Sequence, residues 1–155
     1  MLTAVDHGNH AIKTVHHNFV SGLARHSVRP PMADEVLEYK GEYWTLSGQR
    51  LPYRRDKTRD ESFFILTLFA IAKELSYAGP LPAAEKIELA VGLPPEHYSI
   101  LKDKFRAYFK RSESVQFSYN DKPMTILIRG VLYIRRHLLP SHLRKASSSI
   151  ICACF

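Results

Sequence analysis

The most constraining feature of this chain is its longest apolar run, FFILTLFAIA at residues 63–72. The run is about half as long as the ~20 residues that a transmembrane helix needs, and charged residues bracket it, so we expect a buried helix and no membrane partner. Thr58 and Glu61 have the spacing of a capping box before the run, and Gly79 follows it, which predicts a helix reaching Tyr77. A helix that is apolar on almost every side must be covered by a sheet on one side and by more protein on another.

Shorter apolar runs separated by turn residues predict strands on both sides of this helix. We expect a second, amphipathic helix at residues 96–110 after a proline-rich turn, and a loop or irregular edge at residues 20–32. The expected strands are residues 2–6, 12–17, a hairpin within 35–46, and residues 86–91, 114–119 and 124–128. This order predicts an α/β architecture with a mixed sheet, in which ligands bind at the strand ends where the first turn lies.

The first turn lies in the stretch TAVDHGNHAIKT, residues 3–14. Gly8 and Asn9 are residue types that tolerate positive φ, and a turn that exposes backbone N–H groups beside a glycine forms a concave anion site. Lys13 could reach a phosphate there as a point charge, and Asp6 could hold a divalent cation through its waters. The alternative is an ordinary polar hairpin turn with a solvated lysine, because a motif this short also occurs by chance.

Two metal-based interpretations fit the same region less well. His7, His10, His16 and His17 are close in sequence, but neighbouring histidines on a strand point to opposite faces, and no cysteine or acidic cluster completes a ligand set. Asp6 could belong to a two-metal nuclease site, but the other central strands supply only Glu88 as a second carboxylate.

Charge and cysteine content restrict the function further. Of the net charge of +7, four charges come from the acid-free residues 133–155, so the rest of the chain is only mildly basic and a general nucleic-acid-binding role loses force. Both cysteines, Cys152 and Cys154, lie in the last four residues and cannot form a disulfide framework. With no secretory signal at the N-terminus, these features indicate a cytoplasmic protein.

Three segments together resemble the N-terminal part of the ParM/StbA group of actin-like plasmid segregation ATPases: DHGNHAIK, GQRLPYRRDKTRDESFFILTLFAIAKEL and KIELAVGLPPEHY. The resemblance covers roughly residues 3–132 and implies an actin-like, ribonuclease H-like first subdomain with a mixed sheet of about five or more strands. It further implies ATP and Mg²⁺ as cofactors. Asp6 would lie near the metal, Gly8 and Asn9 would contact the phosphates, and Lys13 would be the phosphate-binding cation.

The sequence also departs from that family. Members have two such halves with the nucleotide between them, and the second phosphate loop, the adenosine site and the residues that orient the attacking water have no counterpart here. After Leu132 the composition changes abruptly, and we interpret residues 133–155 as an aberrant basic tail, disordered or translated out of frame after one missing base.

We therefore expect a truncated actin-like nucleotide-binding protein that binds ATP weakly and does not hydrolyse it. Its full-length relatives would self-associate into filaments and attach to DNA through an adaptor protein. One alternative is a small basic nucleic-acid-binding protein, acting through the tail and the basic face of residues 102–111. The other is a metal-dependent nuclease of ribonuclease H-like fold.

Overall fold

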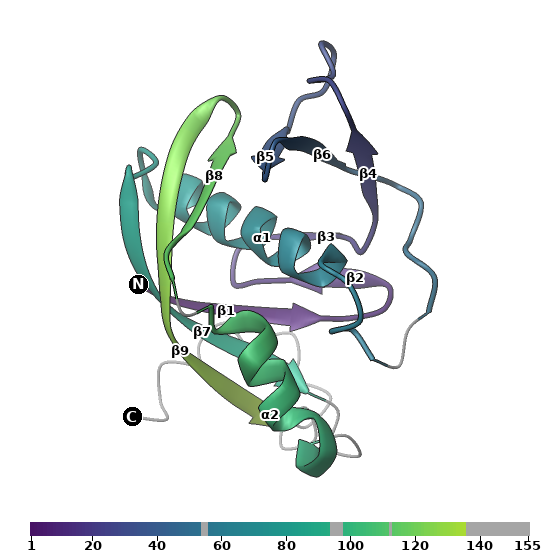
Figure 1. Cartoon of the computed structure of the whole chain (residues 1–155), viewed down its shortest axis with the longest axis vertical. Coiled ribbons are helices and arrows are strands. Elements are labelled where there is room, and N and C mark those ends of the chain that lie inside the picture. The colour runs from purple at the N-terminus through teal and green to yellow at the C-terminus, as the bar shows by residue number, and fades with distance from the viewer. Residues whose placement is uncertain (54–55, 94–97, 112, 136–155) are drawn as a thin grey trace.

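The computed structural model describes residues 1–53, 56–93, 98–111 and 113–135, which form one mixed sheet and two helices (Figure 1). Within these residues the sheet has nine strands in the order β3-β2-β1-β7-β9-β8-β5-β6-β4. The elements are β1 (Leu2–His7), β2 (Ala11–Lys13), β3 (Asn18–Val20), β4 (Leu23–His26), β5 (Leu37–Tyr39), β6 (Glu42–Leu46), α1 (Ser62–Ala78), β7 (Ala84–Leu93), α2 (Tyr98–Phe109), β8 (Val115–Tyr119) and β9 (Lys122–Arg135). The predicted mixed sheet with flanking helices is confirmed.

Three central strands run parallel, which the intervening helices make possible. β1 pairs with β7 and β7 pairs with β9 in parallel, whereas β1, β2 and β3 form an antiparallel meander. Parallel neighbours need a crossover connection, and α1 and α2 occupy the two connections that lead to β7 and toward β9. The ends of β1, β7 and β9 therefore point to the same edge of the sheet.

The long strand β9 joins two parts of the sheet. Its first residues pair antiparallel with β8, and its later residues pair in parallel with β7, so the sheet continues through β8 to β5, β6 and β4. Asn120 and Asp121 form the β8–β9 turn with φ of 49° and 64°, the left-handed conformation of two-residue hairpin turns. β9 continues past Leu132, with Tyr133 opposite Val91, and ends at Arg135. The remaining residues of the expected tail lie outside the described part of the chain.

Helix α1 fills the centre of the molecule. Every residue from Phe63 to Ala72 is buried, and Figure 1 shows the helix running between the β1–β3 meander, the β8–β9 hairpin and the β4–β6 strands. Phe64 lies against Tyr39 with ring centroids 5.9 Å apart, and Phe69 lies edge-on to Tyr119 at 6.2 Å. The expectation of an all-round buried helix is thus confirmed, and no helix in the described residues is long and apolar enough to cross a membrane.

The predicted capping box of this helix is wrong. The helix begins at Ser62, whose N–H donates to the Asp60 carboxylate at 2.9 Å, while Glu61 makes no capping hydrogen bond. The Thr58 hydroxyl donates instead to Asp56 at 2.6 Å. The helix ends at Ala78 before Gly79, as the sequence predicts.

Two short strands lie wholly or partly in the stretch expected to be a loop. β3 and β4 have only three and four residues, too few for a recognisable alternation of apolar and polar side chains. β2 is also shorter than expected: it ends at Lys13, and residues 14–17 form a turn closed by the Thr14 N–H and the His17 carbonyl at 2.8 Å. The expectation of a strand through residues 12–17 is therefore wrong.

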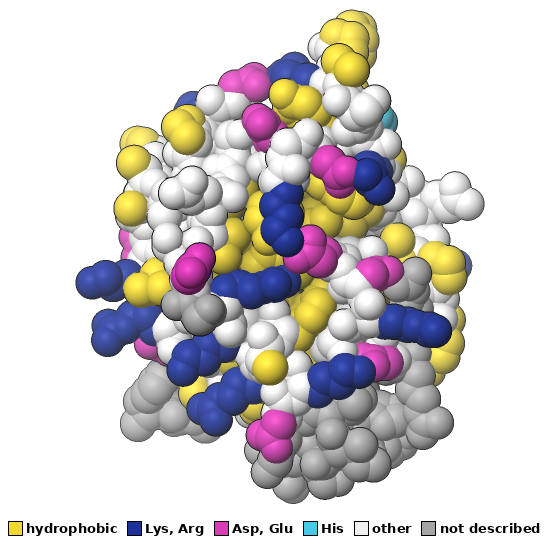
Figure 2. Space-filling model, viewed as in Figure 1, with side chains coloured by type: hydrophobic (Ala, Val, Ile, Leu, Met, Phe, Trp, Pro, Cys, Tyr) yellow, Lys and Arg dark blue, Asp and Glu magenta, His cyan; other side chains and the backbone are white. Residues whose placement is uncertain are grey.

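Helix α2 is amphipathic, as predicted. Phe105 and Phe109 are buried, whereas Lys104, Arg106 and Lys110 are exposed. Figure 2 shows Lys and Arg side chains over the lower half of this face of the molecule, with acidic side chains between them. The expected turn at residues 93–95 begins at Leu93, the last residue of β7; residues 94 and 95, and the expected first helical residues 96 and 97, lie outside the described residues.

Candidate anion-binding site

The turn between β1 and β2 joins the C-terminal end of a central strand to its antiparallel neighbour. In the ladder, Asp6 lies opposite Lys13 and His7 lies opposite Ile12. Directly opposed residues project from the same face, so the Asp6 and Lys13 side chains share one face of the sheet, and His7 and Ile12 share the other. The structure thus brings the two charged candidate residues together at the base of the turn.

Gly8 is required in this turn because space is limited. A Cβ at position 8 would lie 2.5 Å from the Ala11 carbonyl oxygen, and the Gly8 N–H donates to the Asp6 carbonyl at 3.1 Å. Neither Gly8 nor Asn9 has a positive φ, so the expected reason for these residue types is wrong. Within the described residues, the backbone N–H groups of Asn9 and His10 donate no hydrogen bond, which leaves two donors at the tip of the turn.

Lys13 supplies positive charge at this site. Its side chain is exposed and forms no ion pair with any residue that the structure describes. Asp6 and Asn9 are both partly buried, and Asp6 already interacts with another group of the protein. An exposed cation beside two N–H donors is an arrangement suited to an anion.

His7 anchors the turn to the core, a role that sequence reasoning missed. The ring is 1% exposed, stacks on Phe109 at 5.0 Å and lies 2.7 Å from the Thr67 hydroxyl through Nε2. Because the Thr67 hydroxyl donates its only hydrogen to the Phe63 carbonyl at 2.7 Å, Nε2 of His7 must be the donor to Thr67. The signal in the sequence was the alternation of β1, which places His7 on the same face as the buried Val5.

Residues from two other segments, one between β3 and β4 and one between β6 and α1, support the turn. The Ser21 hydroxyl donates to the Gly8 carbonyl at 2.8 Å, and the Ser21 N–H donates to the His10 carbonyl at 3.2 Å. Lys57 donates to the His7 carbonyl, and Arg50 contacts Nδ1 of His10. Sequence reasoning missed these residues because they are distant from the turn in the chain.

The turn after β2 is held by a buried carboxylate. Glu74 is 4% exposed and accepts the Thr14 hydroxyl at 2.5 Å, the His16 N–H at 2.9 Å and His16 Nδ1 at 2.7 Å. Burial alone would raise the pKa of Glu74, but the hydrogen bonds from Thr14 and His16 outweigh it and lower the pKa. The His16 ring also stacks on Tyr77 at 4.0 Å.

The geometry does not assemble the alternative metal sites. No group of three or more His, Cys, Asp or Glu residues that could hold a metal occurs among the residues described. Glu88 lies opposite Leu2, four positions along β1 from Asp6, which corresponds to roughly 13 Å at the rise of a strand. The two carboxylates considered for a nuclease are therefore not neighbours.

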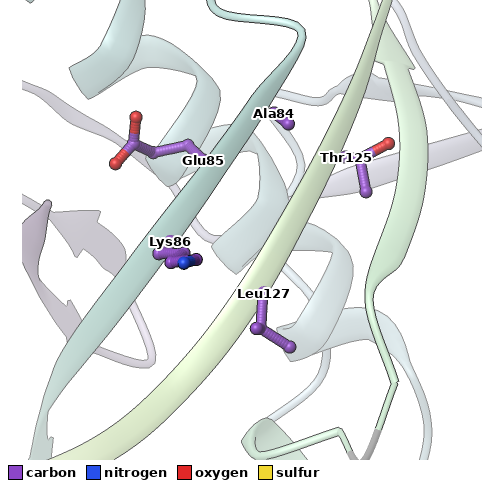
Figure 3. Close-up of a pocket in the computed structure, with 5 residues that line it drawn as sticks. All are labelled: Ala84, Glu85, Lys86, Thr125 and Leu127. Carbon is purple, nitrogen blue, oxygen red and sulfur yellow. The ribbon is translucent and has the colours of Figure 1, made fainter.

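A shallow hollow between β7 and β9 lies at the other end of the sheet (Figure 3). Its lining residues are Ala84, Glu85, Lys86, Thr125 and Leu127, and Glu85 already binds the N-terminal ammonium at 3.1 Å. These residues lie near the start of β7, whereas ligands of open α/β sheets bind beyond the carboxyl ends of the strands. The β1–β2 turn is therefore the better candidate site.

Comparison with known proteins agrees with this fold. Residues 4–135 match the N-terminal domain of the actin-like proteins. The chain belongs to this family. The predicted resemblance to the N-terminal part of actin-like proteins of the ParM type is thus confirmed, and no curated protein matches the chain significantly.

Solved structures share the fold at low sequence identity. The apo ParM protein of pSK41 superposes with a TM-score of 0.68 at 17% identity, covering 87% of this chain and 49% of that protein. An AlfA filament bound to AMPPNP gives a TM-score of 0.64 at 18% identity, covering 89% and 55%. The archaeal actin homologue Ta0583 gives 0.65 at 15%, covering 87% and 45%. This chain spans about half the length of these proteins.

Proposed function

We propose that this actin-like N-terminal domain binds the polyphosphate of ATP at the β1–β2 turn. The observation that carries the proposal is the pair of N–H donors at Asn9 and His10, next to the exposed Lys13. Two donors and a nearby cation suit phosphate oxygens, and Gly8 lets the backbone turn tightly enough to place them together.

Asp6 is the residue that would hold Mg²⁺ in this site. Mg²⁺ prefers oxygen ligands, keeps several waters and is usually bound by one or two carboxylates together with phosphates. Asp6 fits that chemistry because it supplies a carboxylate near the C-terminal end of β1, on the same face of the sheet as Lys13. When bound, the metal would neutralise phosphate charge, while Lys13 and the turn would orient the phosphates.

The biological role that we propose is that of an actin-like protein in plasmid segregation. The similar structures include an AlfA filament with AMPPNP and the ParM protein of pSK41, which supports nucleotide binding and self-association as properties of such proteins. Attachment to DNA through an adaptor and a cytoplasmic location belong to the same proposal.

The test is binding of Mg-ATP to the full chain by titration calorimetry, comparing the unmodified protein with Lys13→Gln. A charge-assisted hydrogen bond contributes about 1.5–3 kcal/mol, so we expect affinity to fall at least about tenfold. Lys122→Gln is the matched control, because Lys122 is exposed at the β8–β9 turn, far along the sheet from Lys13. Absence of binding by the unmodified chain, or equal losses in both variants, would contradict the proposal.

A further inference from the structure

Arg50 lies 40 residues from His10 in sequence, yet the two side chains are in contact. The Arg50 guanidinium contacts Nδ1 of the His10 ring in the β1–β2 turn. Arg50 itself is exposed and belongs to the segment that connects β6 to α1. In Figure 1 this segment descends on the right of the molecule, beside the end of the sheet that holds the turn.

The main chain next to Arg50 is fixed to the turn through Ser21. The Leu51 N–H donates to the Ser21 carbonyl at 2.8 Å, and the buried Ser21 hydroxyl donates to the Gly8 carbonyl at 2.8 Å. The adjacent Gly22 leaves no room for a side chain, because a Cβ there would collide with the carbonyl oxygens of Ser47 and Gln49. Two successive hydrogen bonds, from Leu51 to Ser21 and from Ser21 to Gly8, therefore hold the main chain beside Arg50 close to the turn.

The far end of the same segment is also anchored. Lys57 donates to the His7 carbonyl, and its ammonium lies 5.0 Å from the centre of the Phe63 ring. Asp56 pairs with Lys104 of α2, and hydrogen bonds from Lys104 and Thr58 hold the pKa of Asp56 at about 2. The segment is thus attached through Ser21 to the turn before residues 54–55, and directly to the turn and to α2 after them.

We propose that Arg50 is a further polyphosphate-binding residue, which the segment between β6 and α1 contributes to the anion site of Lys13 at the β1–β2 turn. This inference rests on the proposed function and extends it by assigning a residue from a separate segment to the polyphosphate. A guanidinium binds phosphate oxygens with two parallel N–H groups, and an anionic acceptor attracts it more strongly than a neutral imidazole. A bound phosphate therefore replaces His10 as the partner of Arg50.

The experiment measures binding of ATP and of inorganic tripolyphosphate, both with Mg²⁺, to the full chain by calorimetry. The proteins compared are the unmodified chain, Arg50→Gln, Arg50→Lys and Lys13→Gln. Arg25→Gln is the matched control, because Arg25 is an exposed arginine of β4 that pairs with Glu42. We expect Arg50→Gln to bind both ligands about tenfold more weakly and Arg50→Lys to show a smaller loss.

The outcomes separate the role of Arg50 from the proposed function of the turn. If Lys13→Gln weakens binding while Arg50→Gln behaves like Arg25→Gln, Arg50 is not a ligand and the proposed function stands. If Arg50→Gln weakens ATP binding but leaves tripolyphosphate binding unchanged, the assignment to the polyphosphate is overturned. If the unmodified chain binds neither ligand, both proposals are wrong. Urea unfolding of each variant separates lost binding from lost folding, because substitution of an exposed arginine should leave the midpoint unchanged.

Discussion

Glu74 is a buried carboxylate near the C-terminal end of α1, and it holds the turn that follows β2. Its pKa lies below the usual 4.5 because hydrogen bonds from Thr14 and His16 outweigh the effect of burial. A lowered pKa means that the carboxylate stabilises the fold above about pH 4.5, and that this contribution is lost as pH falls through the folded-state pKa.

We expect Glu74→Gln to lower the free energy of unfolding at pH 7 by about 1–3 kcal/mol, since donors at a buried site lose an anionic acceptor. The difference from the unmodified chain should shrink as the pH drops below 4.5. Urea titrations at several pH values measure both effects, and Glu113→Gln serves as the exposed control. A difference that is constant from pH 7 to pH 3 would show that Glu74 does not act through its charge.

Gly8 provides a second prediction at the level of a single residue. Gly8→Ala places a methyl group against the Ala11 carbonyl, and backbone atoms cannot move aside as a flexible side chain can. We expect a loss of about 1–3 kcal/mol of stability, the usual effect of overpacking. Gly48→Ala is the control because nothing lies within 4 Å of its added Cβ. Equal stability of the two variants in urea would contradict the crowding inferred at the turn.

At the scale of elements, the start of α1 depends on Asp60. The Asp60 carboxylate accepts the N–H of Ser62 at 2.9 Å, and free N–H groups at a helix start are stabilised by such acceptors. We expect Asp60→Ala to lower the free energy of unfolding by about 1 kcal/mol. Asp103→Ala, on the exposed face of α2, should cause no loss of stability, because alanine has the higher helix propensity. Thermal or urea unfolding measures this loss. An Asp60→Ala variant as stable as the unmodified chain would show that Asp60 does not cap the helix and would favour Thr58 and Glu61 instead.

At the scale of the whole molecule, the continuous sheet links the β4–β6 strands to the core. Lys73 of α1 pairs with Glu35, and the Tyr119 hydroxyl donates to the same carboxylate at 2.8 Å. Burial raises the pKa of Glu35, but the bonds from Lys73 and Tyr119 outweigh it, and the net pKa is lowered. The carboxylate therefore joins α1, β8 and the residues before β5.

We expect the chain to unfold in one cooperative step. Trp44, the single tryptophan of the chain, lies in β6, whereas the helical circular dichroism signal reports on helices such as α1, the longer of the two in the described residues. Fluorescence and circular dichroism measured along one urea titration should therefore give the same midpoint. A fluorescence transition at lower urea would show that the β4–β6 strands unfold independently of the core.

Much of the fold could be predicted because several signals are local. The apolar run of α1, the alternation in β8 and the amphipathic pattern of α2 each reflect the period of one element. The strands β3 and β4 could not be predicted in this way, because segments of three and four residues acquire their conformation from the neighbours with which they pair. The start of α1 was also missed, because Asp60 and Thr58 are both suitable residue types and only the final geometry selects between them.

The sequence by itself determined the buried central helix, the first turn with its glycine and lysine, and the family resemblance, since each depends on residues close together in the chain. Only the tertiary structure decided what surrounds that turn. The strand register that sets Asp6 opposite Lys13, the burial of His7 against Thr67 and the contact of Arg50 with His10 join residues of separate elements. Such contacts follow from strand register and packing, and those are fixed only when the whole sheet forms around α1.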